Sequence, residues 1–141
     1  MVSKVRFLIT KNPLTIDKGA TIKQAVDIMS SNNVGSLAIM EDGKLKGIVT
    51  ERDVIKAISK GISTSETVEK IGTLGNLITV NEDDSVFIAA EKMGKYNIRH
   101  LIVLGNDGNF IGIISIRDII REKQVLNALS QTTEEEWTGS D

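Results

Sequence analysis

The sequence predicts an α/β fold in which one β-α-β-β-α unit occurs twice along the 141 residues. Two observations support this prediction. The second half of the chain repeats the first at a nearly constant offset, and both copies show the same order of strand, helix, hairpin and helix. Two copies are too few for a solenoid, so we expect a pseudo-twofold pair whose halves bury a face against each other.

The duplication is visible in identical residues at matched positions. A shift of 64 positions aligns Asn12 with Asn76, Thr15 with Thr79, Ala25 with Ala89 and Met29 with Met93. One extra residue near Gly105 changes the shift to 65, and Arg52-Asp53 then aligns with Arg117-Asp118. The repeated unit therefore covers residues 12–55 and 76–120.

Each element of the unit has its own local pattern. Residues 13–16 and 77–80 are short extended segments, and an amphipathic helix with apolar residues at i, i+3, i+4 and i+7 follows each of them. Strands are expected over 34–40 and 98–104, and return strands over 45–50 and 110–115. Asp42-Gly43 and Asp107-Gly108 are strong hairpin turns. Closing helices are expected over 51–60 and 116–129.

Capping and turn signals add detail to these elements. Thr21 and Gln24 form a plausible capping box, and Met29 and Met93 end the apolar stripes as core residues. Residues 68–71 can form a helical turn, and residues 5–9 precede the first unit in a similar way. We therefore expect a first repeat over 4–60, a connector over 61–76, a second repeat over 77–129 and a mobile acidic tail over 130–141 that carries Trp137.

The composition excludes several classes of function. The chain has no cysteine and one histidine, which excludes disulfides, thiolate nucleophiles, cysteine-based metal sites and multi-histidine metal sites. A net charge of −2 disfavours nucleic-acid binding. Apolar runs such as 101–104 are far shorter than the roughly 20 residues of a membrane-spanning helix. We expect a cytoplasmic protein.

The most informative motif occurs where a strand passes into a helix. It covers residues 47–53 and 112–118, with the pattern Gly, two apolar residues, Thr or Ser, two residues and Asp. One interpretation is purely structural, because Thr50 with Asp53 and Ser115 with Asp118 resemble capping boxes. The other is ligand binding, in which a hydroxyl and an Arg contact phosphate and an Asp accepts from two ribose hydroxyls. Two matching copies favour ligand binding, because capping does not require the shared Arg-Asp.

The chain resembles a tandem pair of CBS domains, the family named after cystathionine β-synthase. Residues 34–53 and 98–118 carry the resemblance, which extends over about 4–121. It implies two β-α-β-β-α repeats packed sheet to sheet, with two clefts that bind adenosyl ligands. AMP is the leading expectation, ADP and ATP are alternatives, and no cofactor is required. The implied role is an energy-sensing regulatory module that signals to a separate partner protein.

The resemblance assigns ligand contacts residue by residue. Thr50 and Asp53 match the phosphate hydroxyl and ribose carboxylate of one cleft, and Ser115 and Asp118 match those of the other. The remaining assignments cover the base pocket, the adenine-reading strand, the apolar sandwich and the arginines: Thr15, Thr79, Ile16, Val80, Val34, Gly35, Ser36, Ile98, Arg99, His100, Arg52 and Arg117. Because Arg99 and His100 replace Gly35 and Ser36, the second cleft is expected to hold phosphate more strongly. For His100 itself, a phosphate contact and a surface or packing role remain equal alternatives.

Two other functions remain open. A structural adapter would use the pair only for dimerisation, with vestigial clefts. A small enzyme is disfavoured, because the motif residues supply no base, nucleophile or metal site. The resemblance also implies a homodimer, and the final helix is expected to add to its interface through Ile119, Ile120, Val125, Leu126 and Leu129.

Overall fold

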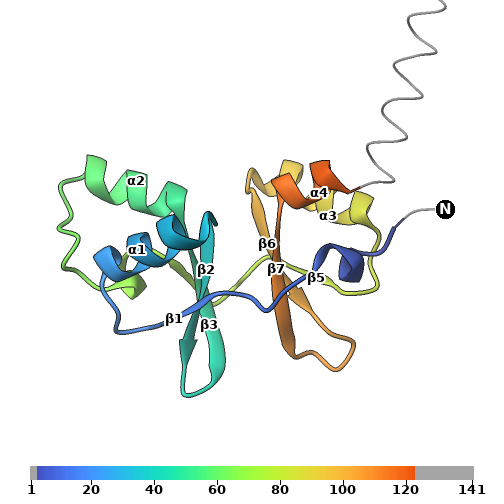
Figure 1. Ribbon diagram of the computed structural model, residues 1–141, viewed down its shortest axis with the longest axis horizontal. Coiled ribbons are helices and arrows are strands. Elements are labelled where there is room, and N and C mark those ends of the chain that lie inside the picture. Colours follow the sequence, from blue (N-terminus) through green and yellow to red (C-terminus); the bar gives the residue numbers. More distant parts are fainter. Residues whose placement is uncertain (1–2, 123–141) are drawn as a thin grey trace, which may run out of the picture. The chain divides into compact units, whose positions relative to one another are not determined.

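Each repeat forms a small mixed sheet with two helices, as the sequence predicts (Figure 1). The computed structural model describes residues 3–122. These residues form two units. One unit consists of residues 12–78, and the other joins residues 79–122 to the N-terminal residues 3–11.

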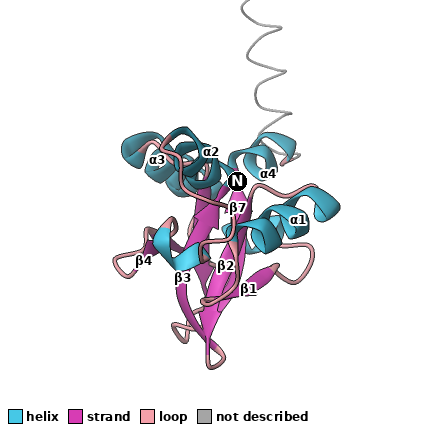
Figure 2. Cartoon of the chain, turned by 90° about the vertical axis from the view of Figure 1, so that its left-hand side faces the viewer, coloured by secondary structure: helices cyan, strands magenta, loops and turns pink. Residues whose placement is uncertain are grey.

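The first unit contains four strands and two α-helices. In chain order these are β1 (Thr15–Asp17), α1 (Ile22–Asn32), β2 (Ser36–Glu41), β3 (Lys44–Thr50) and α2 (Glu51–Ser59), followed by a 3-10 turn, η2 (Val68–Lys70), and β4 (Thr73–Leu74). The sheet order is β1-β2-β3-β4 (Figure 2). β1 runs parallel to β2, and the other neighbours are antiparallel.

The second unit repeats this arrangement with three strands. Its elements are β5 (Thr79–Asn81), α3 (Val86–Tyr96), β6 (His100–Leu104), β7 (Phe110–Ser115) and α4 (Ile116–Arg121), with the N-terminal 3-10 turn η1 (Val5–Leu8). The sheet order is β5-β6-β7. The expected extension of the last helix to residue 129 and the acidic tail over 130–141 lie outside the described residues.

Alternation along the strands places one face of each sheet in a hydrophobic core. In the first unit Ile16, Leu37, Ile39 and Val49 pack with Ala25 and Met29 of α1. The equivalent positions of the second unit are also buried: Val80, Leu101, Val103, Ile114, Ala89 and Met93. Both methionines are core residues, as predicted. Each fully buried aliphatic side chain contributes roughly 1.5–3 kcal/mol.

The two hairpins differ, and the difference accounts for the extra residue near Gly105. Asp42 and Gly43 form a two-residue turn with positive φ angles of 51° and 76°, the geometry of a type I′ hairpin. The β6–β7 loop spans five residues, 105–109, and is closed by a 2.8 Å hydrogen bond from Gly105 N to Asn109 O. There Gly108 has a φ of 84°.

A short segment that precedes each repeat completes the other unit. Val68 N donates to Ala20 O and Ile22 N donates to Glu66 O in the first unit, both at 2.8 Å. At the equivalent positions of the second unit, Val5 N donates to Asp84 O at 2.8 Å and Val86 N to Ser3 O at 2.9 Å. Val5 and Val68 are completely buried. Figure 1 shows the blue η1 turn beside the second unit. The predicted connector, residues 61–76, thus contributes η2 and β4 to the first unit.

None of the helices between residues 3 and 122 combines the length and the apolar character that crossing a lipid bilayer requires.

Candidate functional site

The junction between β3 and α2 holds the first copy of the motif. Thr50 is the N-cap of α2, and its Oγ1 accepts a hydrogen bond from Asp53 N at 3.3 Å. Asp53 Oδ2 in turn accepts from Thr50 N at 2.9 Å and from the Thr50 hydroxyl at 3.1 Å. The predicted capping box is therefore present, and it fixes the direction of the Asp53 carboxylate.

The second copy, between β7 and α4, has the same geometry. Ser115 Oγ accepts from Asp118 N at 3.1 Å, and Asp118 Oδ2 accepts from Ser115 N at 2.8 Å. Within residues 3–122, the hydrogen bonds of both carboxylates use Oδ2. These bonds to Oδ2 fix the orientation of each carboxylate. Oδ1 of the same carboxylate can then accept a hydrogen bond from a ligand.

The capping role gives a direct test of stability. Thr50→Ala should lower the free energy of unfolding by about 1 kcal/mol, because it leaves the Asp53 N–H at the helix start without its acceptor. Thr50→Ser keeps the hydroxyl and should change stability by less. Urea unfolding of both variants measures the difference. An equal loss for Ser and Ala would show that methyl packing, and not the cap, determines the contribution of Thr50.

Strand register gathers the other predicted residues of the first unit around Thr50. Ser36 lies directly opposite Thr50, and Glu51 N donates to Gly35 O at 2.9 Å. Thr15 pairs with Ala38, two residues beyond Ser36, so alternation places Thr15 on the same face as Ser36 and Thr50. These residues belong to the start of β1, the start of β2 and the end of β3.

The second unit assembles the equivalent set around Ser115. His100 lies opposite Ser115, Ile116 N donates to Arg99 O at 2.8 Å, and Thr79 pairs with Ile102. Arg99 is exposed and His100 is half-buried. Each unit therefore carries four matching features at one edge of its sheet: a threonine, the two residues where the central strand begins (35–36 or 99–100), a Thr or Ser hydroxyl, and an aspartate.

The remaining predicted residues fall into three groups. Ile16 and Val80 are 6% and 2% exposed and lie on the core face of the sheets, so a ligand on the opposite face would meet their backbone. Val34 and Ile98 are half-buried, and Val34 packs against the first core. Arg52 is half-buried and Arg117 is exposed.

A lysine that the sequence reasoning missed lies beside the second set. Lys92 Nζ of α3 donates to Thr79 O at 2.7 Å. The equivalent residue of the first unit is Ile28, which packs against the hydrophobic core. Comparing the two copies position by position would have revealed this change from an apolar residue to a cation.

The two sites therefore differ in charge. Lys92, Arg99 and His100 replace Ile28, Gly35 and Ser36, and Ile116 replaces the acidic Glu51 at the start of the closing helix. The second site is the more positive of the two, which favours an anionic ligand there.

Known proteins similar to this chain include enzymes and small proteins. L-aspartate semialdehyde sulfurtransferase of Methanocaldococcus jannaschii is 35% identical over 121 residues, and inosine-5'-monophosphate dehydrogenase of Aquifex aeolicus is 34% identical over 118. The matches cover 85% and 83% of this chain but only 23% and 24% of the enzymes. An uncharacterized 17.7 kDa protein of Acidianus ambivalens is 34% identical, and the match covers 86% of this chain and 73% of that protein.

The solved structures that are similar over most of the chain include two with bound ligands. A CBS domain protein from Pyrobaculum aerophilum, complexed with AMP, has a TM-score of 0.81 and 29% identity, with coverage of 92% of this chain and 99% of the other. A CBS domain pair in complex with 5′-methylthioadenosine and S-adenosyl-L-methionine has a TM-score of 0.77 and 34% identity, with coverage of 86% and 95%.

The family match itself follows the internal duplication. The sequence model of the CBS domain matches residues 2–60 and again residues 68–124. Together with the repeated mixed sheets and the repeated Thr/Ser and Asp junctions, this match shows that the chain belongs to the CBS domain family and carries two copies of the domain in tandem.

Proposed function

We propose that the chain is a regulatory module that binds adenosine derivatives at the two strand–helix junctions. One observation carries the proposal: the hydroxyl and carboxylate of the motif have the same arrangement in both units, at Thr50 with Asp53 and at Ser115 with Asp118. The AMP-bound relative and the relative bound to 5′-methylthioadenosine and S-adenosyl-L-methionine support adenosine as the shared part of the ligand.

In this proposal each residue type has a defined role. Oδ1 of Asp53 or Asp118 accepts from the ribose hydroxyls, and the Thr50 or Ser115 hydroxyl donates to a phosphate oxygen. For Thr50 this requires the hydroxyl to turn its single proton from Asp53 Oδ2 to the phosphate. Arg52 and Arg117 neutralise the phosphate charge. Thr15 and Thr79 line the base pocket, the strand starts at 35–36 and 99–100 read the adenine edge, and Val34 and Ile98 flank the base.

Binding would act through conformation. A ligand that binds one arrangement of the module more tightly than another shifts the population toward that arrangement, and a separate partner protein would respond to the shift. We propose no catalytic step, because the motif offers hydrogen-bond donors and acceptors but no activated nucleophile or base.

Thermal stability tests the proposal with AMP, ADP, ATP, NAD and S-adenosylmethionine as probes. A ligand present at about 100 times its dissociation constant stabilises the folded state by about 2.7 kcal/mol, which is a clear shift in Tm. A shift with at least one probe is expected. If all five leave Tm unchanged, the structural adapter becomes the better explanation and the motif reduces to its capping role.

The charge difference between the units gives a second prediction. Lys92→Ile with Arg99→Gly installs the first-unit residues in the second unit and should weaken AMP binding there by roughly tenfold, about 1.4 kcal/mol. Adenosine, which carries no phosphate, should bind nearly unchanged. Calorimetry with both ligands measures the effect. Equal weakening of AMP and adenosine would show that the two side chains support the fold of the site and not phosphate recognition.

Homodimerisation is part of the same proposal. Of the residues expected at the interface, Ile120 is 55% exposed, Ile119 is only 5% exposed, and the other three lie beyond residue 122. Ile55 and Ile58 add exposed apolar surface on α2. Sedimentation at micromolar concentration should give twice the mass of one chain. A monomer at that concentration would remove dimerisation from the proposal.

A further inference from the structure

The segments before the two repeats occupy equivalent places but carry opposite charges. Arg6 corresponds to Glu69, because η1 and η2 make matching backbone contacts 63 positions apart (Val5 with Val68). Glu82 corresponds to Lys18 at the repeat offset of 64. Arg6 Nη2 lies 3.3 Å from Glu82 Oε1, and Lys18 Nζ lies 3.5 Å from Glu69 Oε2. The same ion pair is thus present in both units with its signs reversed.

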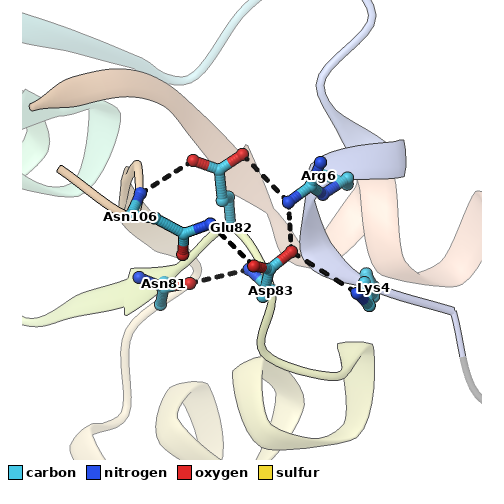
Figure 3. Close-up of polar contacts among 6 residues, drawn as sticks. All are labelled: Lys4, Arg6, Asn81, Glu82, Asp83 and Asn106. Carbon is cyan, nitrogen blue, oxygen red and sulfur yellow. Dashed lines mark hydrogen bonds and ion pairs between the residues drawn. The ribbon is translucent and has the colours of Figure 1, made fainter.

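The second unit reinforces its version of the pair. Arg6 also pairs with Asp83, and Lys4 Nζ lies 3.6 Å from Asp83 Oδ1 (Figure 3). In the first unit the corresponding residues are the uncharged Gly19 and Thr67. The N-terminal segment is therefore basic against an acidic loop, whereas the segment over 66–70 presents Glu69 to the single cation Lys18.

Further contacts hold the acidic loop in place. Asn106 Nδ2 donates to Asp83 Oδ2 at 2.8 Å, and Asn106 N donates to Glu82 Oε2 at 2.9 Å. Asn106 belongs to the β6–β7 loop, where the second repeat has its extra length. The hydrogen bond from Asn106, and after it the one from Arg6, lowers the pKa of Asp83. This carboxylate therefore stays charged at pH values where an ordinary aspartate begins to take up a proton.

The alternative arrangement is easy to define. Each segment could pack on the repeat that follows it directly, which would require closing a shorter loop. Arg6 would then face Lys18, and Glu69 would face Glu82, so both attractions would become repulsions. Exposed ion pairs add little to stability, but a change of sign at two positions discriminates between competing pairings.

We propose that this reversal of charge selects which segment completes which unit: the N-terminal segment joins the second repeat and the segment over 66–70 joins the first. The ion pairs determine which segment pairs with which repeat. Val5 and Val68 are both buried, but because both are valine their packing does not distinguish the two pairings.

Disulfide competition reads the choice directly, because the chain has no cysteine of its own. Thr67 forms an isolated antiparallel β-bridge with Thr21 in the first unit. Ser85 is the residue of the second unit that is equivalent to Thr21. Thr21→Cys, Thr67→Cys and Ser85→Cys together let position 67 bond to 21 or to 85 without changing any charge. Residues paired in an antiparallel bridge have Cα separations that a disulfide spans.

With native charges, the 67–21 disulfide should exceed the 67–85 disulfide at least tenfold, as measured by peptide mass mapping. Exchanging the segment charges with Arg6→Glu and Glu69→Arg should reverse the preference. Adding Lys18→Glu, Glu82→Lys and Asp83→Asn to that variant should restore it. Circular dichroism establishes that each variant is folded.

Two outcomes would overturn the proposal. One is a folded segment-exchange variant that keeps the native ratio of disulfides. The other is a segment-exchange variant that unfolds and is not rescued by the loop substitutions, because the proposal requires that restored charge complementarity restores the pairing. A segment-exchange variant that unfolds but folds again when the loop substitutions are added supports the proposal, because charge complementarity then decides whether the segments pair. Nucleotide binding plays no part in this experiment.

Discussion

Asp118→Ala should weaken binding of AMP to the second site by roughly 10- to 100-fold. The substitution removes a carboxylate whose Oδ2 is held by Ser115 N at 2.8 Å and whose Oδ1 is proposed to accept the ribose hydroxyls. Hydrogen bonds to charged groups contribute about 1.5–3 kcal/mol, which corresponds to that range. Isothermal titration calorimetry measures the change.

Two controls separate binding from folding. Asp118→Asn keeps an acceptor for Ser115 N, so its Tm without ligand should fall less than that of Asp118→Ala, while its AMP affinity should still fall because the charge is lost. Asp107→Ala removes an exposed aspartate of the β6–β7 loop and should leave AMP binding unchanged. AMP affinity of Asp118→Ala within twofold of the native value would contradict the ribose role.

The second large effect concerns stability. Gly47→Ala should lower the free energy of unfolding by about 1–3 kcal/mol, the range for overpacked interiors. A Cβ at Gly47 would lie 2.3 Å from Thr73 O and 2.6 Å from Leu74 Cδ2, so the backbone of β4 must move away from β3. Urea unfolding of the variant measures the loss.

The chain contains its own control for this substitution. Gly112 is the equivalent residue of the second unit, where a Cβ would lie 3.0 Å from Ile9 Cδ1 and 3.3 Å from two other atoms of the Ile9 side chain. A side-chain end can shift at small cost, so Gly112→Ala should destabilise the protein less than Gly47→Ala. If both variants lost the same free energy of unfolding, a clash between the new Cβ and the backbone of β4 could not be the cause of the loss at Gly47.

The sequence was sufficient for several features that depend on local chemistry. Apolar periodicity identified α1 and α3, Asp42-Gly43 identified the first hairpin, and the hydroxyl–acid spacing identified both capping boxes. These features depend on residues at most seven positions apart in the sequence, where side-chain type and spacing determine the buried face and the local hydrogen bonds.

Features that depend on distant residues were out of reach. Val5 and Val68 look alike in sequence, and only tertiary contacts show that each completes the repeat it does not directly precede. Ile16 and Val80 were expected to flank the base, but which face of a three-residue strand is buried depends on its neighbours. Lys92 reaches Thr79 across 13 positions, from a helix to a strand.

Adenosine recognition by the duplicated Thr/Ser and Asp junctions is the central claim. Its most direct test is calorimetric titration of the native protein with AMP, ADP, ATP and S-adenosylmethionine, repeated on the variant with Asp53→Asn and Asp118→Asn. The claim predicts saturable binding of at least one ligand to the native protein and at least tenfold weaker binding to the double variant, with both proteins folded. Absence of binding to the native protein, or unchanged affinity in the double variant, would contradict it.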